Sequence, residues 1–236
     1  MKLLHIVATP RSHASNTMRI SNAFLEAMYA RYADLEVEVL DLFDVDLPSV
    51  AGDNIESKYT LMSGSIIDKR HEQSWKQIES FIEHFKSADA YLLTVPMWNF
   101  SIPYTLKYYI DAIVQPGYTF RYNEQGYPEG LVKGKNMVCV TSRGGDYSPD
   151  SPFNAYDFQE PYLRAIFGWI GISEVDFINA QPMDITPEMR QAAVKKAIEE
   201  AKALAVVCDW SVARESDAEE DLTGLKPPPL KSKKDG

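Results

Sequence analysis

The chain has 236 residues, 45% of them hydrophobic and 11% aromatic, which is enough to bury one sizeable core. Its formal net charge of -10 argues against nucleic acid and against a membrane surface as partners, because both attract basic patches. No apolar run approaches the roughly 18 residues that cross a bilayer. Cys139 and Cys208 belong to no C-x-x-C pair and no metal-ligand cluster, so we expect reduced, buried thiols in a cytoplasmic protein without a metal.

Strand and helix patterns alternate along the chain from its first residues. Short apolar or alternating runs predict five strands, at 3–8, 36–42, 91–95, 137–141 and 175–180. Apolar residues at helical spacing predict helices that begin near residues 16, 75, 103, 158 and 187. This alternation predicts an α/β fold with a doubly wound, five-stranded parallel sheet in the order 2-1-3-4-5 and helices on both faces.

Three segments depart from the alternation. Residues 44–67 have no firm period and predict a loop or short helix over a site. Residues 118–132 predict a small hairpin outside the main sheet. Beyond about Arg214 an acidic run precedes a lysine-rich stretch with three prolines in series. We therefore expect one domain over residues 1–210 and a flexible, charged, proline-containing tail over 211–236.

Two loops that follow predicted strands suit a flat ligand. Pro96, Met97, Trp98, Asn99 and Phe100 come directly after the third strand, and Ser142-Arg143-Gly144-Gly145 comes after the fourth. Open α/β sheets bind ligands at the carboxyl ends of their strands, where these loops meet. The glycine pair lets backbone N–H groups approach a planar ring closely. The two loops therefore indicate a flavin site.

A hydroxyl-rich segment over residues 9–17 follows the first strand and ends where the first helix begins. Hydroxyls, Arg11 and the N–H groups of a helix N-terminus together suit a phosphate group. The sequence has neither a dinucleotide G-x-G-x-x-G motif nor a P-loop, which favours a mononucleotide. An ordinary Ser/Thr helix cap remains an equal alternative for this segment alone. The three loops together predict flavin mononucleotide (FMN).

Several ordered sequence blocks resemble the family of FMN-dependent NADH azoreductases and quinone reductases. They are PMWNFSIP at 96–103, LKYYID at 106–111, TFRY at 119–122, GLVKGK at 130–135, TSRGG at 141–145, PYL at 161–163 and FGWIGI at 167–172. The resemblance implies a flavodoxin-like fold and an FMN enzyme. Such an enzyme transfers two electrons by ping-pong hydride transfer from NADH or NADPH to quinone or azo acceptors. The resemblance also implies a homodimer with the site at the subunit interface.

The resemblance assigns a role to each loop, with the chemistry on FMN and no catalytic residue in the protein. The phosphate would be held by Thr9, Arg11, Ser15, Asn16 and Thr17. The ring edge and ribityl chain would be held by Pro96, Met97, Trp98, Asn99 and Phe100. The pyrimidine side of the ring would be supported by Ser142, Arg143, Gly144 and Gly145. Backbone donors there would stabilise the negative charge that arrives with a hydride.

Alternatives remain for individual residues and for the whole chain. Phe100 and Phe120 are either a lid over the substrate ring or core aromatics. Arg143 is either a cofactor residue or the partner of a surface carboxylate. An acidic flavodoxin-like electron carrier without its own small-molecule substrate is a second hypothesis, although the aromatic segment 118–122 argues against it. A flavin-free scaffold is a third.

Overall fold

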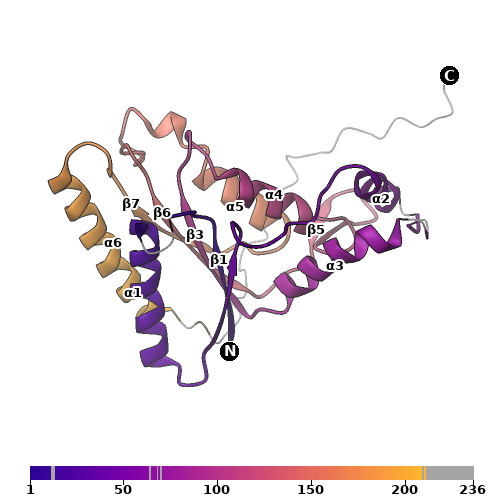
Figure 1. Ribbon diagram of the computed structural model, residues 1–236, viewed down its shortest axis with the longest axis horizontal. Coiled ribbons are helices and arrows are strands. Elements are labelled where there is room, and N and C mark those ends of the chain that lie inside the picture. Colours follow the sequence, from indigo (N-terminus) through magenta and orange to yellow (C-terminus); the bar gives the residue numbers. More distant parts are fainter. Residues whose placement is uncertain (12–13, 64, 68, 70, 209, 211–236) are drawn as a thin grey trace.

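The computed structural model describes residues 1–11, 14–63, 65–67, 69, 71–208 and 210. Its central sheet has five parallel strands in the order β2-β1-β3-β6-β7 (Figure 1). Their bounds are Glu36–Asp41, Lys2–Val7, Ala90–Pro96, Asn136–Ser142 and Val175–Ala180, in that order. Because β4 and β5 lie outside this sheet, the order is the 2-1-3-4-5 of the sequence prediction, which is confirmed. The predicted tail over 211–236 lies outside the described residues.

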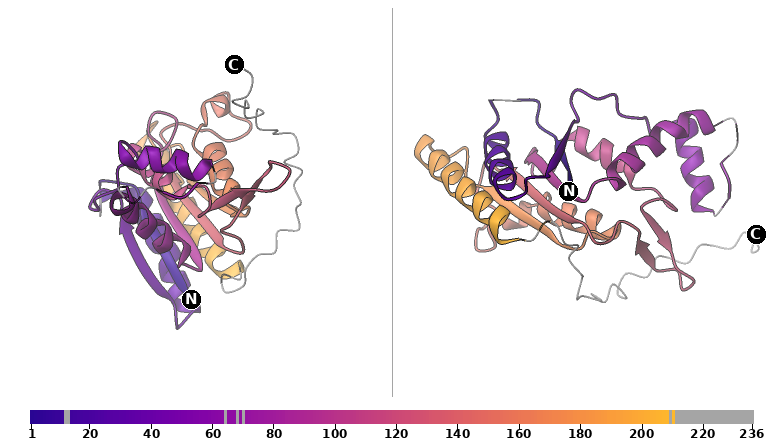
Figure 2. Two further views of the ribbon diagram at one scale, coloured as in Figure 1. Left: turned by 90° about the vertical axis from the view of Figure 1, so that its right-hand side faces the viewer. Right: turned by 90° about the horizontal axis from the view of Figure 1, so that it is seen from below.

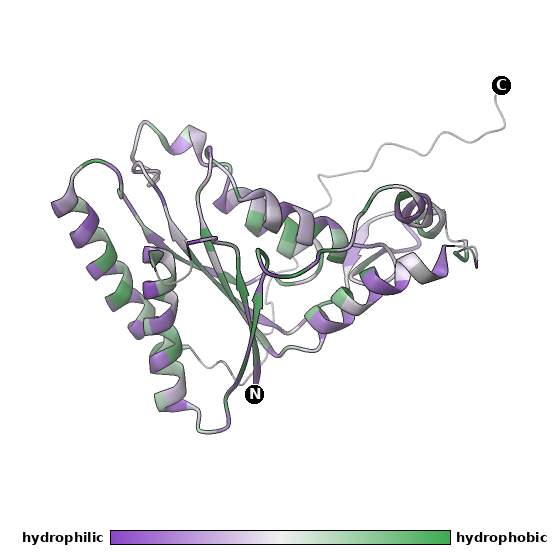
Figure 3. Ribbon diagram, viewed as in Figure 1, coloured by the Kyte–Doolittle hydropathy of each residue, from purple (hydrophilic) through white to green (hydrophobic). Residues whose placement is uncertain are grey.

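Helices cover both faces of the sheet. Helices α1 (Asn16–Arg31) and α6 (Pro187–Val207) pack side by side on one face (Figures 1 and 2). The other face carries α3 (Glu72–Lys86), α4 (Tyr104–Ile113) and α5 (Glu160–Trp169). In Figure 3 the helices carry both hydrophobic and hydrophilic residues, whereas the strands between them are largely hydrophobic. The buried residues accordingly form two clusters, one on each face of the sheet.

The edge strand β2 is buried on one face and exposed to solvent on the other near its end. Leu40 is buried, whereas Val39 is 59% exposed. The buried residues near the end of this strand are Leu40 and Leu42, which belong to the cluster of the α3 face. At the edge of the sheet only part of each face has a helix above it.

Two smaller pieces complete the fold. Helix α2 (Asp53–Met62) packs beside α3, so the predicted loop or short helix is a helix. Strands β4 (Phe120–Tyr122) and β5 (Pro128–Gly130) form the predicted antiparallel hairpin. Within the described chain, no helix has the length and apolar character needed to cross a membrane. The expected burial of both cysteines holds for Cys139, whereas Cys208 is half-buried.

Candidate cofactor site

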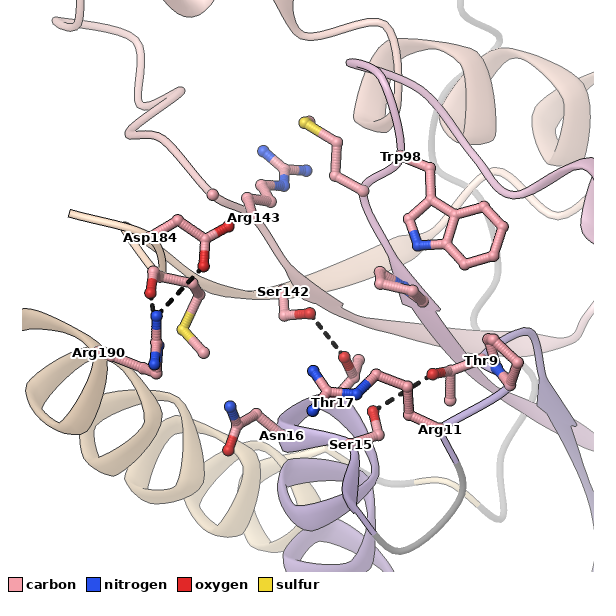
Figure 4. A pocket seen from close by; sticks show the side chains of 15 residues that line it. Thr9, Arg11, Ser15, Asn16, Thr17, Trp98, Ser142, Arg143, Asp184 and Arg190 are labelled. Atoms are coloured by element: carbon pink, nitrogen blue, oxygen red, sulfur yellow. Dashed lines mark hydrogen bonds and ion pairs between the residues drawn. The ribbon is translucent and has the colours of Figure 1, made fainter. Parts of the chain in front are cut away.

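A cavity of about 400 Å³ lies at the carboxyl ends of β1, β3 and β6 (Figure 4). Parallel neighbouring strands end at the same edge, so loops that are distant in sequence meet there. The predicted site residues that line the cavity are Thr9, Arg11, Ser15, Asn16, Thr17, Pro96, Met97, Trp98, Ser142, Arg143 and Gly144. Asn99, Phe100 and Gly145 from the same loops are not among its lining residues.

The first loop places the N-terminus of α1 against the cavity. Ser15 caps the helix, because its side chain accepts a hydrogen bond from the backbone N–H of Met18. By helix geometry the backbone N–H groups of Asn16 and Thr17 have no acceptor within the helix. The first turn contains no acidic residue. The helix cap is therefore present, and it leaves the positive end of the helix dipole free for an anion.

Hydroxyl side chains around the N-terminus of α1 form hydrogen bonds with one another. Thr9 Oγ1 donates to Ser15 Oγ at 3.4 Å, and the hydroxyls of Thr17 and Ser142 lie 2.7 Å apart (Figure 4). The second contact joins the first turn of α1 to the end of β6. Arg11 is exposed and makes no ion pair within the described part of the chain. Its charge is available to a ligand.

The second loop contains a strained turn. Trp98 and Ser101 exchange two backbone hydrogen bonds, of 2.9 and 3.0 Å, around Asn99 and Phe100. Both central residues have positive φ, 47° and 70°, which is typical of a type I′ turn. Asn tolerates this conformation, but a bulky aromatic rarely adopts it. Strain of this kind concentrates at functional sites, where neighbouring structure holds it in place.

Phe100 itself is 45% exposed beside the cavity. Its ring lies 5.5 Å from the ring of Tyr156 and 6.4 Å from that of Tyr147, measured between centroids. Its carbonyl accepts a 3.0 Å hydrogen bond from the backbone N–H of Phe158. Phe100 is therefore a surface aromatic held by the segment that precedes α5, and it is not a core residue.

The third loop holds a buried arginine. The Arg143 guanidinium is 1% exposed and contacts Asp157 Oδ2 at 2.8 Å and Glu160 Oε2 at 3.4 Å. Its Nε donates to Thr141 Oγ1 at 3.1 Å. The alternative in which Arg143 pairs with carboxylates is thus realised, although these carboxylates are only 7% and 23% exposed. The charge of Arg143 is already neutralised, and we infer that this side chain positions the loop.

Glu160 connects this arginine to β7 and α5. Burial raises the pKa of Glu160, but hydrogen bonds from Asn179 and Arg164 and the charges of Arg164 and Arg143 outweigh it. The net effect holds the pKa of the Glu160 carboxyl below its ordinary value. Glu160 is therefore ionised at neutral pH and keeps its ion pairs.

A fourth segment, which the sequence analysis missed, also lines the cavity. It contributes Met183 and Asp184 from the connection between β7 and α6, and Arg190 from the N-terminal part of α6. Arg190 Nε donates to the carbonyl of Met183 at 2.6 Å, and Arg190 lies 3.4 Å from Asp184 Oδ1 (Figure 4). A Cβ on Gly144 would lie 2.8 Å from Asp184 Oδ2, so the glycine makes this close approach possible. The expected strand order already placed β7 beside β6, and that was the available signal.

Other predicted positions lie away from the cavity. Phe120 is 7% exposed and packs edge-on against Trp169 at 5.7 Å, so within one chain it is a core aromatic. Gly145 lies beside the ring of Tyr147. The segment 44–67 was predicted to lie over a site, yet none of its described residues lines this cavity. Its helix is held at α3 instead.

Comparisons with known proteins agree with this geometry. A family model described as a flavodoxin-like fold matches residues 1–205. An FMN-dependent NADH:quinone oxidoreductase from Nitratidesulfovibrio vulgaris (strain DP4) is 37% identical over 205 residues, which are 86% of this chain and 98% of the relative. FMN-dependent NADH:quinone oxidoreductase 2 from Pseudomonas syringae pv. tomato is 36% identical over 87% of this chain and 98% of the relative.

Solved structures give the same result. An azoreductase from Bacillus anthracis str. Sterne superposes with a TM-score of 0.78 at 25% identity, covering 87% of this chain and 98% of that one. An FMN-dependent NADH-azoreductase from Bacillus anthracis str. Ames Ancestor, solved in complex with FMN, has a TM-score of 0.74 at 28% identity. It covers 86% of this chain and 99% of that one.

Proposed function

Since this chain belongs to the flavodoxin-like family of FMN-dependent NADH:quinone oxidoreductases, we propose that its cavity binds FMN and transfers electrons from NADH or NADPH to quinones or azo compounds. Two electrons would be transferred together as a hydride. The nicotinamide donor would bind and leave before the acceptor binds at the same site. The observation that carries the proposal is the meeting of three loops around one cavity, with a free helix N-terminus at one of them.

The α1 end of the cavity suits the FMN phosphate. The N–H groups of Asn16 and Thr17 offer hydrogen bonds, and Arg11, which makes no ion pair with any residue that the structure describes, offers a charge. The hydrogen bond from the Thr9 hydroxyl to the Ser15 hydroxyl keeps these two side chains together before a ligand enters. A preformed phosphate site lowers the entropy lost when the cofactor binds.

The opposite part of the cavity suits a flat ring. Pro96, Met97 and Trp98 line it at and after the end of β3, and Gly144, which has no side chain, lines it from the loop after β6. The Met97 N–H donates to the Ser142 carbonyl at 2.9 Å, which ties these two loops together. When bound, FMN supplies the reversible acceptance of two electrons, and the protein supplies its position and surroundings. The buried Arg143 and its carboxylates keep the ring-facing loop in place.

Exposed aromatic side chains beside the cavity support a homodimer with the site at its interface. Tyr104, 69% exposed, has its ring 6.4 Å from that of Trp98, and Phe158 and Tyr156 flank Phe100 on the other side. Large aromatics that gather on a surface mark an interaction site. A second copy would cover them and close the cavity toward the acceptor.

The same proposal includes the boundaries and location expected from the sequence. Residues 1–210 would form the FMN domain, and the remaining residues would be a separate tail. A chain with two cysteines and no C-x-x-C pair suits the reducing conditions of the cytoplasm. Small quinone or azo molecules would be the acceptors.

An anaerobic absorbance experiment tests the function. FMN-loaded protein is mixed with NADH or NADPH and then with a simple quinone, with free FMN at the same concentration as the control. We expect rapid loss of the visible flavin band with one of the nicotinamides and its full return after the quinone is added. Protein that binds FMN but reacts with neither nicotinamide would favour the electron carrier instead. Protein that binds no FMN would refute both.

A further inference from the structure

A groove of about 500 Å³ lies between α1 and α6, which pack side by side (Figure 1). Its lining residues come from these two helices, with Asn16 and Arg19 on α1 and the others within residues 190–202 of α6. We call it the α1–α6 groove. It shares Asn16 and Arg190 with the cofactor cavity, so the two adjoin at one end of the groove.

The groove carries an excess of positive charge, although the whole chain has a formal net charge of -10. Arg19, Arg190, Lys195 and Lys202 line it, and Glu199 is the carboxylate among its lining residues. Neither lysine makes an ion pair with a residue that the structure describes. Such a concentration of cations on an acidic protein favours an anionic occupant.

The groove also has an aliphatic floor. Val194 is buried and Ile198 is half-buried, and both line the groove one helical turn apart on α6. Lys195 and Lys202 are exposed on the same stretch of the helix. An occupant that matches both features has anionic groups for the lysines and an apolar side chain for the floor.

The chain leaves the folded domain beside the same two helices. Trp210, which follows α6, is 2% exposed, and its ring lies 5.3 Å from that of Phe24 on α1, measured between centroids. The Trp210 N–H donates to the Tyr32 hydroxyl at 3.1 Å, which fixes this point of the chain at the C-terminal end of α1. The residues after Trp210 therefore start at the end of the helix pair that is farther from the cofactor cavity.

An acidic segment comes next in the sequence. Residues 215–221, with the sequence ESDAEED, carry five carboxylates and no cation, and Leu222 follows them directly. These residues lie outside the part of the chain that the structure describes, and the match to the family model ends before them, at residue 205. The segment has both the anionic groups and the apolar side chain that the groove favours.

The length of chain after Trp210 lets this segment reach the groove. Along α6, Lys202 lies about 8 Å and Arg190 about 26 Å from Val207, at a rise of about 1.5 Å per residue. The eleven residues 211–221 span up to about 36 Å when extended, at about 3.3 Å each. The segment can therefore lie along the whole groove without being fully extended.

The spacing of the charges also matches. Lys195 and Lys202 are about 10 Å apart along the axis of α6. In the polyproline II conformation, residues three positions apart point to the same side and lie about 9 Å apart. Asp217 and Glu220 have this separation in sequence.

We propose that the acidic segment 215–221 of this chain docks in the α1–α6 groove of the same molecule. Its carboxylates would pair with Lys195 and Lys202, and Leu222 would cover the aliphatic floor. Exposed ion pairs are individually weak, but a short tether gives an effective concentration on the order of millimolar, so weak contacts suffice. The docked segment would cover the groove up to the end that adjoins the cofactor cavity.

Proteolysis of the full chain by an endoprotease that cuts after glutamate tests the proposal. The variant is K195Q/K202Q, and the control is K196Q, whose lysine is exposed on the same helix outside the groove. Docking protects the bonds after the three glutamates of the segment, so we expect about fivefold faster cleavage there in the double variant and no change in the control. In about 1 M NaCl the parent protein should be cleaved as fast as the double variant, because salt screens the ion pairs.

A variant of the tail alone provides a second test. D217N/D221N keeps the three glutamates, changes no residue of the folded domain and should also speed cleavage. Carbodiimide coupling, which joins a lysine amine to a carboxylate as an amide, then identifies the contact by mass spectrometry. In an equal mixture of unlabelled and isotope-labelled protein, we expect Lys195 or Lys202 to be joined to the acidic segment within one molecule.

Two results would overturn the proposal. One is equal cleavage of the parent protein, K195Q/K202Q and D217N/D221N. The other is coupling only between labelled and unlabelled molecules, because the groove would then hold the tail of a second copy. Both assays use neither nicotinamide nor acceptor, so their failure leaves the proposed function standing.

Discussion

Removing the guanidinium of Arg143 should destabilise the fold and loosen the ring-facing loop. Arg143→Met keeps most of the side-chain volume and leaves Asp157 and Glu160 without their buried cation. One-sided loss of a buried ion pair costs about 3–5 kcal/mol. Glu160 is partly exposed and keeps Arg164 and Asn179, so we attribute the cost to Asp157 and expect ~3 kcal/mol. For a domain of this size that lowers Tm by about 6–12 °C.

Urea unfolding of the flavin-free protein measures this cost, and FMN titration measures the effect on the site. The double-mutant cycle with Asp157→Asn is the control, because it separates the pair from the loss of packing. We expect a coupling of about 2 kcal/mol and weaker FMN binding in both single variants. A free energy of unfolding within about 1 kcal/mol of the parent protein would refute the positioning role.

Three further predictions test separate features. Arg11→Ala should weaken FMN binding about tenfold without changing the affinity for riboflavin, which lacks the phosphate, as titration would measure. Burial lowers the pKa of His5 to about 4, below the value of 6.5 that it has in the unfolded chain. The contribution of the neutral His5 to the free energy of unfolding is therefore fully present above pH 6.5 and is lost as the pH falls from there toward 4. The loss is ~3 kcal/mol by urea unfolding, and His5→Asn should abolish it. Gly130→Ala would overlap the backbone nitrogen of Gly171 and should cost about 1–3 kcal/mol in thermal unfolding, whereas Gly168→Ala, with open space, should not.

The fold was predictable because its strands are short and separated by amphipathic helices. Three of the five strands, β1, β3 and β6, are mostly apolar and almost wholly buried, as expected when helices cover both faces of a parallel sheet. Thr186 and Pro187 marked the start of α6, and Thr186 indeed accepts the N–H of Met189. The segment 44–67 gave no periodic signal, because α2 buries only Asn54 and Ser57, which are polar. Hydrophobic periodicity cannot reveal such a helix.

The site was predictable where the loop chemistry was local. Hydroxyls before a helix and glycines after a strand are visible in the sequence, and strand order brings them together. Asp184 and Arg190 were missed because their segment has no distinctive composition and lines the cavity only through strand order. The role of Arg143 depends on Asp157 and Glu160, which are separated from it by 14 and 17 positions in sequence. The sequence alone does not show which charged residues pair with each other across an irregular loop.

The strained turn and the buried arginine belong to one arrangement. Positive φ at Phe100 costs about 1–3 kcal/mol, so other contacts must hold the turn. The Phe158 N–H binds the Phe100 carbonyl, and the adjacent Asp157 is fixed by Arg143. The loop after β6 thus restrains the loop after β3 through the segment before α5. Two loops that face one ligand are thereby fixed relative to each other before it binds. This explains why the charge of an arginine that lines the cavity is paired with two carboxylates of the protein.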